Sequence, residues 1–284
     1  MRTIEKKSGN KNFIYNTAES EFKQLSQYID QDKEHRNSLI DEYDEKNRYS
    51  SIKPYKHNCI EINSKEKYIN ASPVNFYYDK YMILTQGPKS NTTEDFWTMI
   101  YQYDCNIIIM LTRLMEESLE KCFYYWDPNY KMEKYKIILL SEQYKKYKLI
   151  VTRKIKLINI SSNEERIITQ LHFLAWPDLG IPFNTQTFEV FQYMIEETEK
   201  MKNNKPFVVH CGGGVGRTGT FTSIYFLYKE IMEQINNKNL KNIRFSVFNI
   251  VRKIKETRLY SVETPKQYQF IHEFVNWLLI KYNI

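Results

Sequence analysis

Residues 208–219 constrain this chain more than any other stretch, because they place a thiol and a guanidinium at the two ends of a glycine-rich turn. An apolar strand ends at Cys211, five residues follow, and Arg217 then opens a helix. Four of those five residues are glycine, so the backbone can turn its N–H groups inward without a Cβ clash. N–H groups gathered at a helix N-terminus bind phosphate. The stretch therefore predicts an anion-binding turn between a strand and a helix.

The side chains at both ends of this turn are suited to phosphate transfer. The guanidinium fork of Arg217 holds two phosphate oxygens at once. The same positive surroundings favour the thiolate form of Cys211, which is then a nucleophile aimed at phosphorus. A cysteine in a turn is more often a small buried hydrophobe, but Thr218, placed to hydrogen-bond the sulfur, favours the catalytic interpretation. We therefore expect the turn to bind phosphate through Gly212, Gly213, Gly214, Val215 and Gly216.

Cleavage of a phosphate ester also requires a proton for the leaving oxygen. A tyrosyl oxygen has a pKa near 10, so it leaves slowly unless it is protonated. A carboxylic acid on a movable loop supplies that proton while it excludes water. Asp178 is the candidate, on a short turn in which Trp176 and Gly180 act as hinges. By itself, Pro-Asp-Leu-Gly is an ordinary turn sequence.

The length and composition predict one soluble domain. The chain has 284 residues, of which 42% are hydrophobic, enough for a single α/β domain with a large core. No apolar run approaches the roughly 20 residues of a membrane span, and the polar N-terminus does not resemble a signal peptide. Four cysteines without paired or metal-binding spacing indicate a reducing compartment, with Cys59, Cys105 and Cys122 as structural thiols.

The net charge of +7 favours anionic partners such as phosphoproteins, nucleic acid or acidic membrane surfaces. Charge alone does not choose among them. One group of basic residues suggests a surface for polyanions, although such a group is more often a solvated helix face: Arg252, Lys253, Lys255 and Arg258.

Hydrophobic periodicity predicts a mixed sheet with helices on both sides. Residues 1–16 are expected to be a flexible lead-in, and residues 17–284 one domain that begins with a helix carrying Phe22, Leu25 and Ile29. Strands are expected at 106–111, 135–140, 147–160, 167–173 and just before Cys211. Apolar stripes indicate helices around 96–101, 188–195, 221–235, 247–254 and 270–278, the last with Thr264, Pro265 and Gln267 as a capping box.

Together these residues resemble the tyrosine-specific protein tyrosine phosphatases from about Phe22 to Leu279. The resemblance implies a highly twisted mixed sheet flanked by helices. The richness in Lys, Asn, Ile and Tyr is also similar to that of phosphatases of insect-associated viruses. The matching motifs occur in family order at 46–49, 68–72, 85–88, 116 with 121–122, 176–178, 210–219 and 262–268.

The resemblance also implies roles for individual residues. Cys211 attacks phosphorus, Arg217 clamps the equatorial oxygens, and Asp178 protonates the departing tyrosine and then activates water. Tyr49 stacks on the substrate ring and makes the pocket deep enough to select phosphotyrosine. Glu116 orients Arg217, Gln267 contacts substrate, and the remaining supporting residues are Lys121, His210, Thr218, Trp176 and Glu263. Neither a metal nor a cofactor is implied.

The implied protein is a cytoplasmic monomer that acts on phosphotyrosine-containing proteins, with no nucleic-acid partner and no membrane span. Several departures from the family leave alternatives open. Gly212-Gly213 replaces Ser-Ala, Ser51 replaces an Asp that holds the peptide backbone, Glu263 replaces a water-positioning Gln, and Tyr260 replaces the Gly of some members. A phosphotyrosine-binding trap with poor turnover is one alternative, and a phosphatase for RNA 5′ ends or phosphoinositides is another.

Overall fold

The computed structural model describes residues 18–27, 40, 42–75, 82–177, 180–183, 186–237 and 243–284. Residues 18–27 form the first predicted helix, with Leu25 fully buried and Phe22 half-buried against the core. Ile29, expected on the same face, and the predicted lead-in 1–16 lie outside the described residues.

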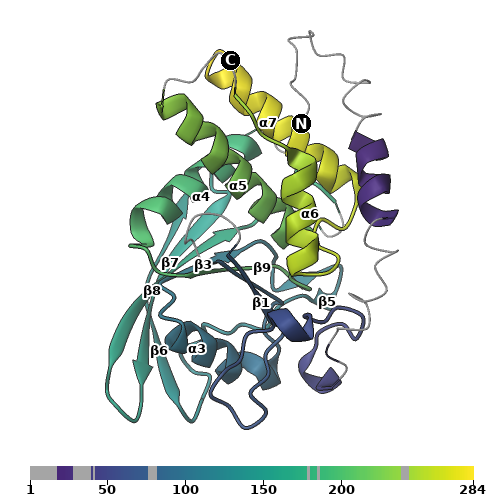
Figure 1. Ribbon diagram of the computed structural model, residues 1–284. Coiled ribbons are helices and arrows are strands. Elements are labelled where there is room, and N and C mark those ends of the chain that lie inside the picture. The colour runs from purple at the N-terminus through teal and green to yellow at the C-terminus, as the bar shows by residue number, and fades with distance from the viewer. Residues whose placement is uncertain are drawn as a thin grey trace.

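A seven-stranded mixed sheet forms the centre of the fold (Figure 1). Its order is β1-β2-β9-β3-β8-β7-β6. The four central strands β2, β9, β3 and β8 are parallel, while β1 at one edge and β7 and β6 at the other pair antiparallel. The strands span Ala71–Val74 (β1), Met82–Thr85 (β2), Ile107–Met110 (β3), Tyr135–Lys145 (β6), Ile150–Asn159 (β7), Glu165–Phe173 (β8) and Phe207–His210 (β9). A separate hairpin pairs β4 (Met115–Glu116) with β5 (Leu119–Glu120).

Helices cover both faces of this sheet, as the sequence predicts (Figure 1). Four long helices lie on one face: α4 (Thr187–Met201), α5 (Gly216–Asn236), α6 (Val247–Thr257) and α7 (Pro265–Lys281). Helix α3 (Thr93–Gln102) covers the other face. Short 3-10 helices occur at Asp44–Lys46, Lys56–Asn58 and Ser90–Thr92.

The alternation of side chains along the central strands builds two cores. On β3, Ile107 and Ile109 pack toward α4–α7, while Ile108 and Met110 pack toward α3. All four side chains are fully buried. A strand covered on both faces is an uninterrupted apolar run because neither face meets water, and this accounts for the sequence of β3.

One predicted boundary is wrong, at the turn between β6 and β7. Strand β6 extends to Lys145, and β7 begins only at Ile150, whereas the sequence suggests strands at 135–140 and 147–160. Lys146, Tyr147 and Lys148 all have positive φ, between 38° and 61°. Such left-handed residues cannot continue a strand, so they form the turn.

The capping of α7 also differs in detail from the prediction. The Thr264 side chain accepts a hydrogen bond from the Gln267 backbone N–H (3.2 Å), as a cap should. The Gln267 side chain, however, accepts from the backbone N–H of Glu263 (2.9 Å) and not from that of Thr264. The contact therefore fixes the residue before the cap, which is Glu263.

The carboxyl ends of the parallel strands meet along one edge, where open α/β sheets bind their ligands. His210 is in register with both Thr85 of β2 and Met110 of β3, and Met110 is in register with His172 of β8. The residues that follow these strands therefore converge. Within the described part of the chain, no helix is long and apolar enough to cross a membrane.

Candidate active site

Cys211 follows β9 directly and lies almost buried, with 4% of its surface exposed. The loop 212–215 then leads into α5. The Gly214 N–H donates a hydrogen bond to Cys211 Sγ (3.2 Å), and Gly214 has φ of +73°. A Cβ at this residue would stand 2.2 Å from the Thr85 carbonyl oxygen, so only glycine fits.

A buried guanidinium holds this loop from behind. Arg258 Nε donates to the carbonyl oxygen of Gly214 (2.8 Å), and its Nη2 donates to that of Gly213 (3.2 Å) and to Asn70 Oδ1 (2.7 Å). In a trans peptide the C=O and the following N–H point in opposite directions. Because the carbonyls face Arg258, the N–H groups of Gly214 and Val215 face away from it. Burial lowers the pKa of Arg258 to about 10, so it remains a cation at neutral pH.

Arg217 and Glu116 form the predicted carboxylate–guanidinium pair. Nη1 lies 2.7 Å from Oε1 and Nη2 lies 2.7 Å from Oε2, with both side chains largely buried. The Thr112 hydroxyl accepts from Arg217 Nη1 (3.1 Å) and donates to Glu116 Oε1 (3.0 Å). Such a two-pronged, charge-assisted contact fixes the orientation of the guanidinium.

A pocket of about 280 Å³ opens above Cys211. Tyr49 forms one wall, since its ring lies 3.3 Å from the position that a Cβ would take at Gly213 and its hydroxyl lies 3.7 Å from that at Gly212. Ile52 stands beside it, with Cδ1 2.8 Å from a Cβ at Gly213. The lining residues are Tyr49, Ser51, Ile52, Lys121, Cys211, Gly212, Gly213, Val215, Gly216, Arg217, Glu263 and Gln267.

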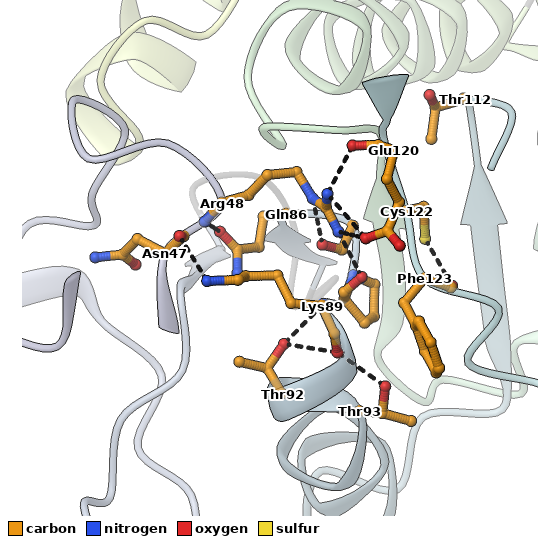
Figure 2. Close-up of polar contacts among 12 residues, drawn as sticks. Asn47, Arg48, Gln86, Lys89, Thr92, Thr93, Thr112, Glu120, Cys122 and Phe123 are labelled. Atoms are coloured by element: carbon orange, nitrogen blue, oxygen red, sulfur yellow. Dashed lines mark hydrogen bonds and ion pairs between the residues drawn. The ribbon is translucent and has the colours of Figure 1, made fainter. Parts of the chain in front are cut away.

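Arg48 fixes the segment that carries Tyr49 (Figure 2). Its guanidinium donates to the carbonyl oxygens of Gly87 (3.1 Å), Pro88 (2.7 Å) and Glu120 (2.8 Å). The Arg48 backbone N–H donates to Gln86 Oε1 (2.8 Å). The motifs at 46–49 and 85–88 are thus joined to Glu120, the residue before the motif at 121–122, although the three are far apart in sequence.

The predicted acid, Asp178, lies outside the described residues, and its role stays a prediction. The residues on either side of it are described. Trp176 is buried, and its indole N–H donates to the Gly180 carbonyl oxygen (3.0 Å). The Trp176 carbonyl oxygen accepts from Arg217 Nη1 (3.2 Å). Trp176, two residues before Asp178 in the sequence, is therefore held next to Arg217.

The expected hydrogen bond from Thr218 to the sulfur is not formed. Thr218 is fully buried in the first turn of α5, and its hydroxyl has no hydrogen-bond partner among the described residues. The Gly214 N–H contacts the sulfur in its place, because the left-handed turn directs that group inward. His210, also buried, contacts the Cys211 carbonyl oxygen through Nδ1 (3.2 Å), and burial lowers its pKa to about 4.

Glu263 brings a carboxylate to the end of the pocket formed by the N-terminus of α5. Its Oε2 lies 2.7 Å from a Cβ built at Gly216, the first residue of α5, and the Gln267 amide lies 3.1–3.2 Å from the same point. A helix N-terminus attracts negative charge, whether it belongs to a ligand or to a side chain. Glu263 therefore lies where a bound anion would feel its charge.

The sequence did not reveal several residues that shape the site. Arg258 was expected on a basic surface, but it and Lys255 are buried, with 0% and 6% of their surfaces exposed. The proposed polyanion surface therefore loses half of its members. Thr112 gave a faint signal as the first polar residue after the apolar run of β3. The role of Arg48 follows only from its contacts.

The chain is also similar to known proteins along most of its sequence. The sequence profile of the family described as "Protein-tyrosine phosphatase" matches residues 43–277. A rat tyrosine-protein phosphatase non-receptor type 20 is 33% identical over 81% of this chain and 53% of its own length. A rat non-receptor type 2 enzyme is 34% identical over 83% of this chain and 56% of its own. The chain therefore spans about half the length of these relatives.

Solved structures share the fold. The crystal structure of the catalytic domain of human protein tyrosine phosphatase non-receptor type 18 aligns with a TM-score of 0.81 at 24% identity, over 93% of this chain and 96% of that one. A structure described as PTPN18 in complex with HER2-pY1248 phosphopeptides aligns with a TM-score of 0.81 at 25% identity, over 92% and 99% of the two chains. The predicted phosphatase-like architecture is confirmed.

Replacing Gly214 by alanine should disable anion binding, because the new Cβ would collide with the Thr85 carbonyl oxygen at 2.2 Å. We expect affinity for inorganic phosphate, measured by calorimetry, to fall about 100-fold, as when a pair of charge-assisted hydrogen bonds is lost. Gly212→Ala is the matched control, since its Cβ would meet only ordinary contacts at 3.6 Å or more. Equal affinities in the two variants would contradict this account of the loop.

Stability should fall with acid because His172 is buried as a neutral ring. Burial, aided by the nearby Arg153, lowers the pKa of His172 to about 3. Below pH 6.5 the unfolded chain takes up a proton that the folded state does not, so stability present above pH 6.5 is lost as the pH falls toward 3. Between pH 7 and pH 4 we expect this group to account for about 3 kcal/mol of lost unfolding free energy.

Urea unfolding of the wild type and His172→Gln at pH 7 and pH 4 measures that contribution. The variant should lose less stability on acidification than the wild type. His57→Gln, which alters an exposed histidine, should behave as the wild type does. An identical acid loss in the wild type and His172→Gln would show that His172 is not the group responsible.

Proposed function

The chain belongs to the protein-tyrosine phosphatase family, whose profile matches residues 43–277, and we propose that it hydrolyses phosphotyrosine in proteins through a phosphocysteine intermediate. One observation carries the proposal: Cys211 Sγ, contacted by the Gly214 N–H, shares a pocket with the Arg217 guanidinium. A nucleophile, amide donors and a clamp for oxyanions are the groups that phosphoryl transfer requires.

In the first step, the phosphate of the substrate binds the loop 212–216. Arg217 donates to two of its oxygens, and backbone N–H groups donate to the others. Glu116 holds Arg217 in place through its 2.7 Å contacts. The phosphorus then lies in line between the sulfur and the tyrosyl oxygen, a geometry that lowers the entropic cost of attack.

In the second step, the Cys211 thiolate attacks and the sulfur–phosphorus bond forms as the bond between phosphorus and the tyrosyl oxygen breaks. Asp178 gives its proton to that oxygen, so neutral tyrosine leaves. Negative charge on the transferring group is stabilised by Arg217 and the loop amides. The proposal includes neither a metal nor a cofactor.

In the third step, water attacks the phosphocysteine. Asp178, now a carboxylate, accepts a proton from the water, and the sulfur leaves as thiolate with release of phosphate. Gln267 and Glu263 line the pocket and are the groups placed to influence this water. The carboxylate of Glu263 disfavours a second negative charge nearby.

Selectivity for phosphotyrosine follows from Tyr49. Its ring covers Gly213 and lengthens the route from the surface to Cys211, so a short phosphoserine side chain falls short of the sulfur. The stacking of aromatic rings stabilises the tyrosyl group on the way. We therefore propose phosphotyrosine-containing proteins as the substrates, and the structure of PTPN18 with phosphopeptides supports peptide binding by this fold.

The setting of the proposed enzyme follows from its thiol. Cys211 must stay reduced, which suits the cytoplasm. The other described cysteines are also free thiols, and burial raises the pKa values of Cys105 and Cys122 above the ordinary range and that of Cys59 to about 12. We propose one catalytic domain over residues 17–284 acting as a monomer, since one chain lines the whole pocket.

The two alternatives have unequal support. A phosphatase for RNA 5′ ends or phosphoinositides depended on a basic surface, and the burial of Lys255 and Arg258 removes much of it. A substrate trap with poor turnover keeps one specific observation in its favour, the Glu263 carboxylate beside Gly216.

Cys211→Ser should abolish hydrolysis of a phosphotyrosyl peptide, because a hydroxyl cannot replace the thiolate. Asp178→Ala should lower kcat by roughly 10² to 10⁴ while substrate binding is retained. Release of phosphate and binding of labelled peptide measure the two effects. Cys59→Ser removes a thiol that does not line the pocket and should keep full activity. Robust turnover by Cys211→Ser would refute the mechanism.

Glu263→Gln distinguishes an active enzyme from a trap. Without the carboxylate, the steady-state rate at pH 7 should rise about 10-fold if phosphocysteine hydrolysis limits turnover, because like-charge repulsion is removed. Rapid-quench kinetics should show the stoichiometric burst of product shrinking relative to the steady state. Sustained turnover by the wild type with no burst would exclude the trap.

A further inference from the structure

A row of polar side chains crosses the three strands β6, β7 and β8 at one side of the sheet. Glu142, Arg153 and Gln170 stand opposite one another on the neighbouring strands β6, β7 and β8. Arg153 Nε donates to Glu142 Oε2 (2.5 Å), and Arg153 Nη1 donates to Gln170 Oε1 (2.6 Å). Gln170 is fully buried and Arg153 is 7% exposed, so the bond between them lies where water does not compete with it. Glu142, with 41% of its side chain exposed, lies at the solvent end of the row.

A first arm leads from this row to Cys211. Gln170 Nε2 donates to the Tyr125 hydroxyl oxygen (2.7 Å), and that oxygen lies 2.9 Å from His210 Nε2. His210 Nδ1 contacts the Cys211 carbonyl oxygen (3.2 Å). A carbonyl only accepts, so Nδ1 carries the ring proton and Nε2 accepts from Tyr125. Every bond in the arm therefore donates toward Cys211.

A second arm leads to Arg217. Arg153 Nη1 lies 3.1 Å from His172 Nδ1, and His172 Nε2 lies 2.7 Å from the Thr112 carbonyl oxygen. A guanidinium only donates, so Nδ1 accepts and Nε2 donates to Thr112. The hydroxyl of the same Thr112 contacts both Arg217 Nη1 (3.1 Å) and Glu116 Oε1 (3.0 Å). This arm therefore ends where the anion clamp is held.

Both imidazoles keep these directions because both are neutral. Burial lowers the pKa of His210 to about 4 and, together with Arg153, that of His172 to about 3. Each ring thus accepts on one side and donates on the other across the neutral pH range. In both arms the hydrogen bonds donate away from the Arg153 guanidinium. Its positive charge therefore polarises, and strengthens, the hydrogen bonds of each arm in that direction.

We propose that Arg153 is a positioning residue for the phosphate pocket, one guanidinium that sets the backbone at Cys211 and at Thr112 together. The sulfur follows strand β9, whereas the guanidinium of Arg217 on α5 is held by Thr112, which follows strand β3. A phosphoryl group must meet both in one geometry. Two arms from one cation fix the two strand ends relative to each other. The inference deepens the proposed function but depends on it only for the kinetic readout below.

A merely structural role would cost stability and nothing else, so the control must cost stability too. Arg166 on β8 provides that match. It pairs with Glu164 (2.9 Å) and Asp104 (3.3 Å) and stacks on the Tyr101 ring at 3.9 Å, as Arg153 stacks on Trp126 at 4.6 Å. Its hydrogen bonds go to Glu164, Tyr101 and Asp104, and none of these residues lines the pocket.

The experiment compares Arg153→Met with Arg166→Met below the unfolding transition of each variant. The rate of Cys211 alkylation by iodoacetate at pH 6, followed by mass spectrometry, reports the first arm. Affinity for inorganic phosphate by calorimetry reports the second. We expect Arg153→Met to slow alkylation and to weaken phosphate binding by about 10-fold each, the contribution of one hydrogen bond of ordinary strength, and Arg166→Met to change neither.

Gln170→Met removes hydrogen bonds of the first arm only. This variant replaces Arg153→Met in the test if Arg153→Met does not fold. It should slow alkylation while phosphate affinity stays within about 2-fold of wild type. Alkylation and phosphate affinity in Arg153→Met equal to those in Arg166→Met, or unchanged alkylation in Gln170→Met, would overturn the proposal. Steady-state kinetics with phosphotyrosyl peptide complete the test: a chain that shows these effects but hydrolyses no peptide would refute the proposed function and leave the positioning role standing.

Discussion

The hydrogen bonds from Arg258 to the carbonyl oxygens of Gly213 and Gly214 are the constraint on which the pocket depends. A glycine-rich loop is free to point its N–H groups in many directions, and each glycine adds to the entropic cost of fixing one of them. The guanidinium removes this freedom by drawing the carbonyls to the protein side. Since each peptide group is planar and trans, the donors are then left to the ligand side.

The sheet determines which groups meet around that loop. Four parallel strands end at one edge, and each delivers a different part: Gln86 and Gly87 after β2, Thr112 after β3, Trp176 after β8 and Cys211 after β9. Groups held by regular strands are placed more accurately than groups on long loops. Helix α5 completes the arrangement, because its N-terminus starts where the loop ends.

Much of this arrangement could be predicted from local patterns. The strand–turn–helix around Cys211 and the two-faced burial of β3 follow from glycine chemistry and apolar runs, and the family motifs named Glu116 as the partner of Arg217. Contacts between distant segments could not be predicted in this way. Arg258 sits in a basic, helical stretch that looks like a solvated face, and only the fold buries it against Asn70.

Contacts of the Cys211 sulfur and of the sheet residues were also beyond prediction from local sequence patterns. Thr218 was expected to contact Cys211 because the two are near in sequence, yet the left-handed turn at Gly214 supplies the donor instead. Likewise, the alternation of residues along β6, β7 and β8 does not predict that Glu142, Arg153 and Gln170 lie opposite one another. That prediction would require the register in which the three strands pair. The proposed acid, Asp178, stays a sequence-based prediction.

The closeness of Ile52 to Gly213 has an evolutionary consequence. A methyl group at residue 213 would meet Ile52 Cδ1 at 2.8 Å, so the side chains at residues 52 and 213 compete for the same space. The width of the pocket therefore depends on the combined size of these two side chains. Substitutions at either are expected to be non-additive. Descendants of this chain would therefore exchange bulk between residues 52 and 213 in compensated pairs, and the two positions should drift together through the lineage.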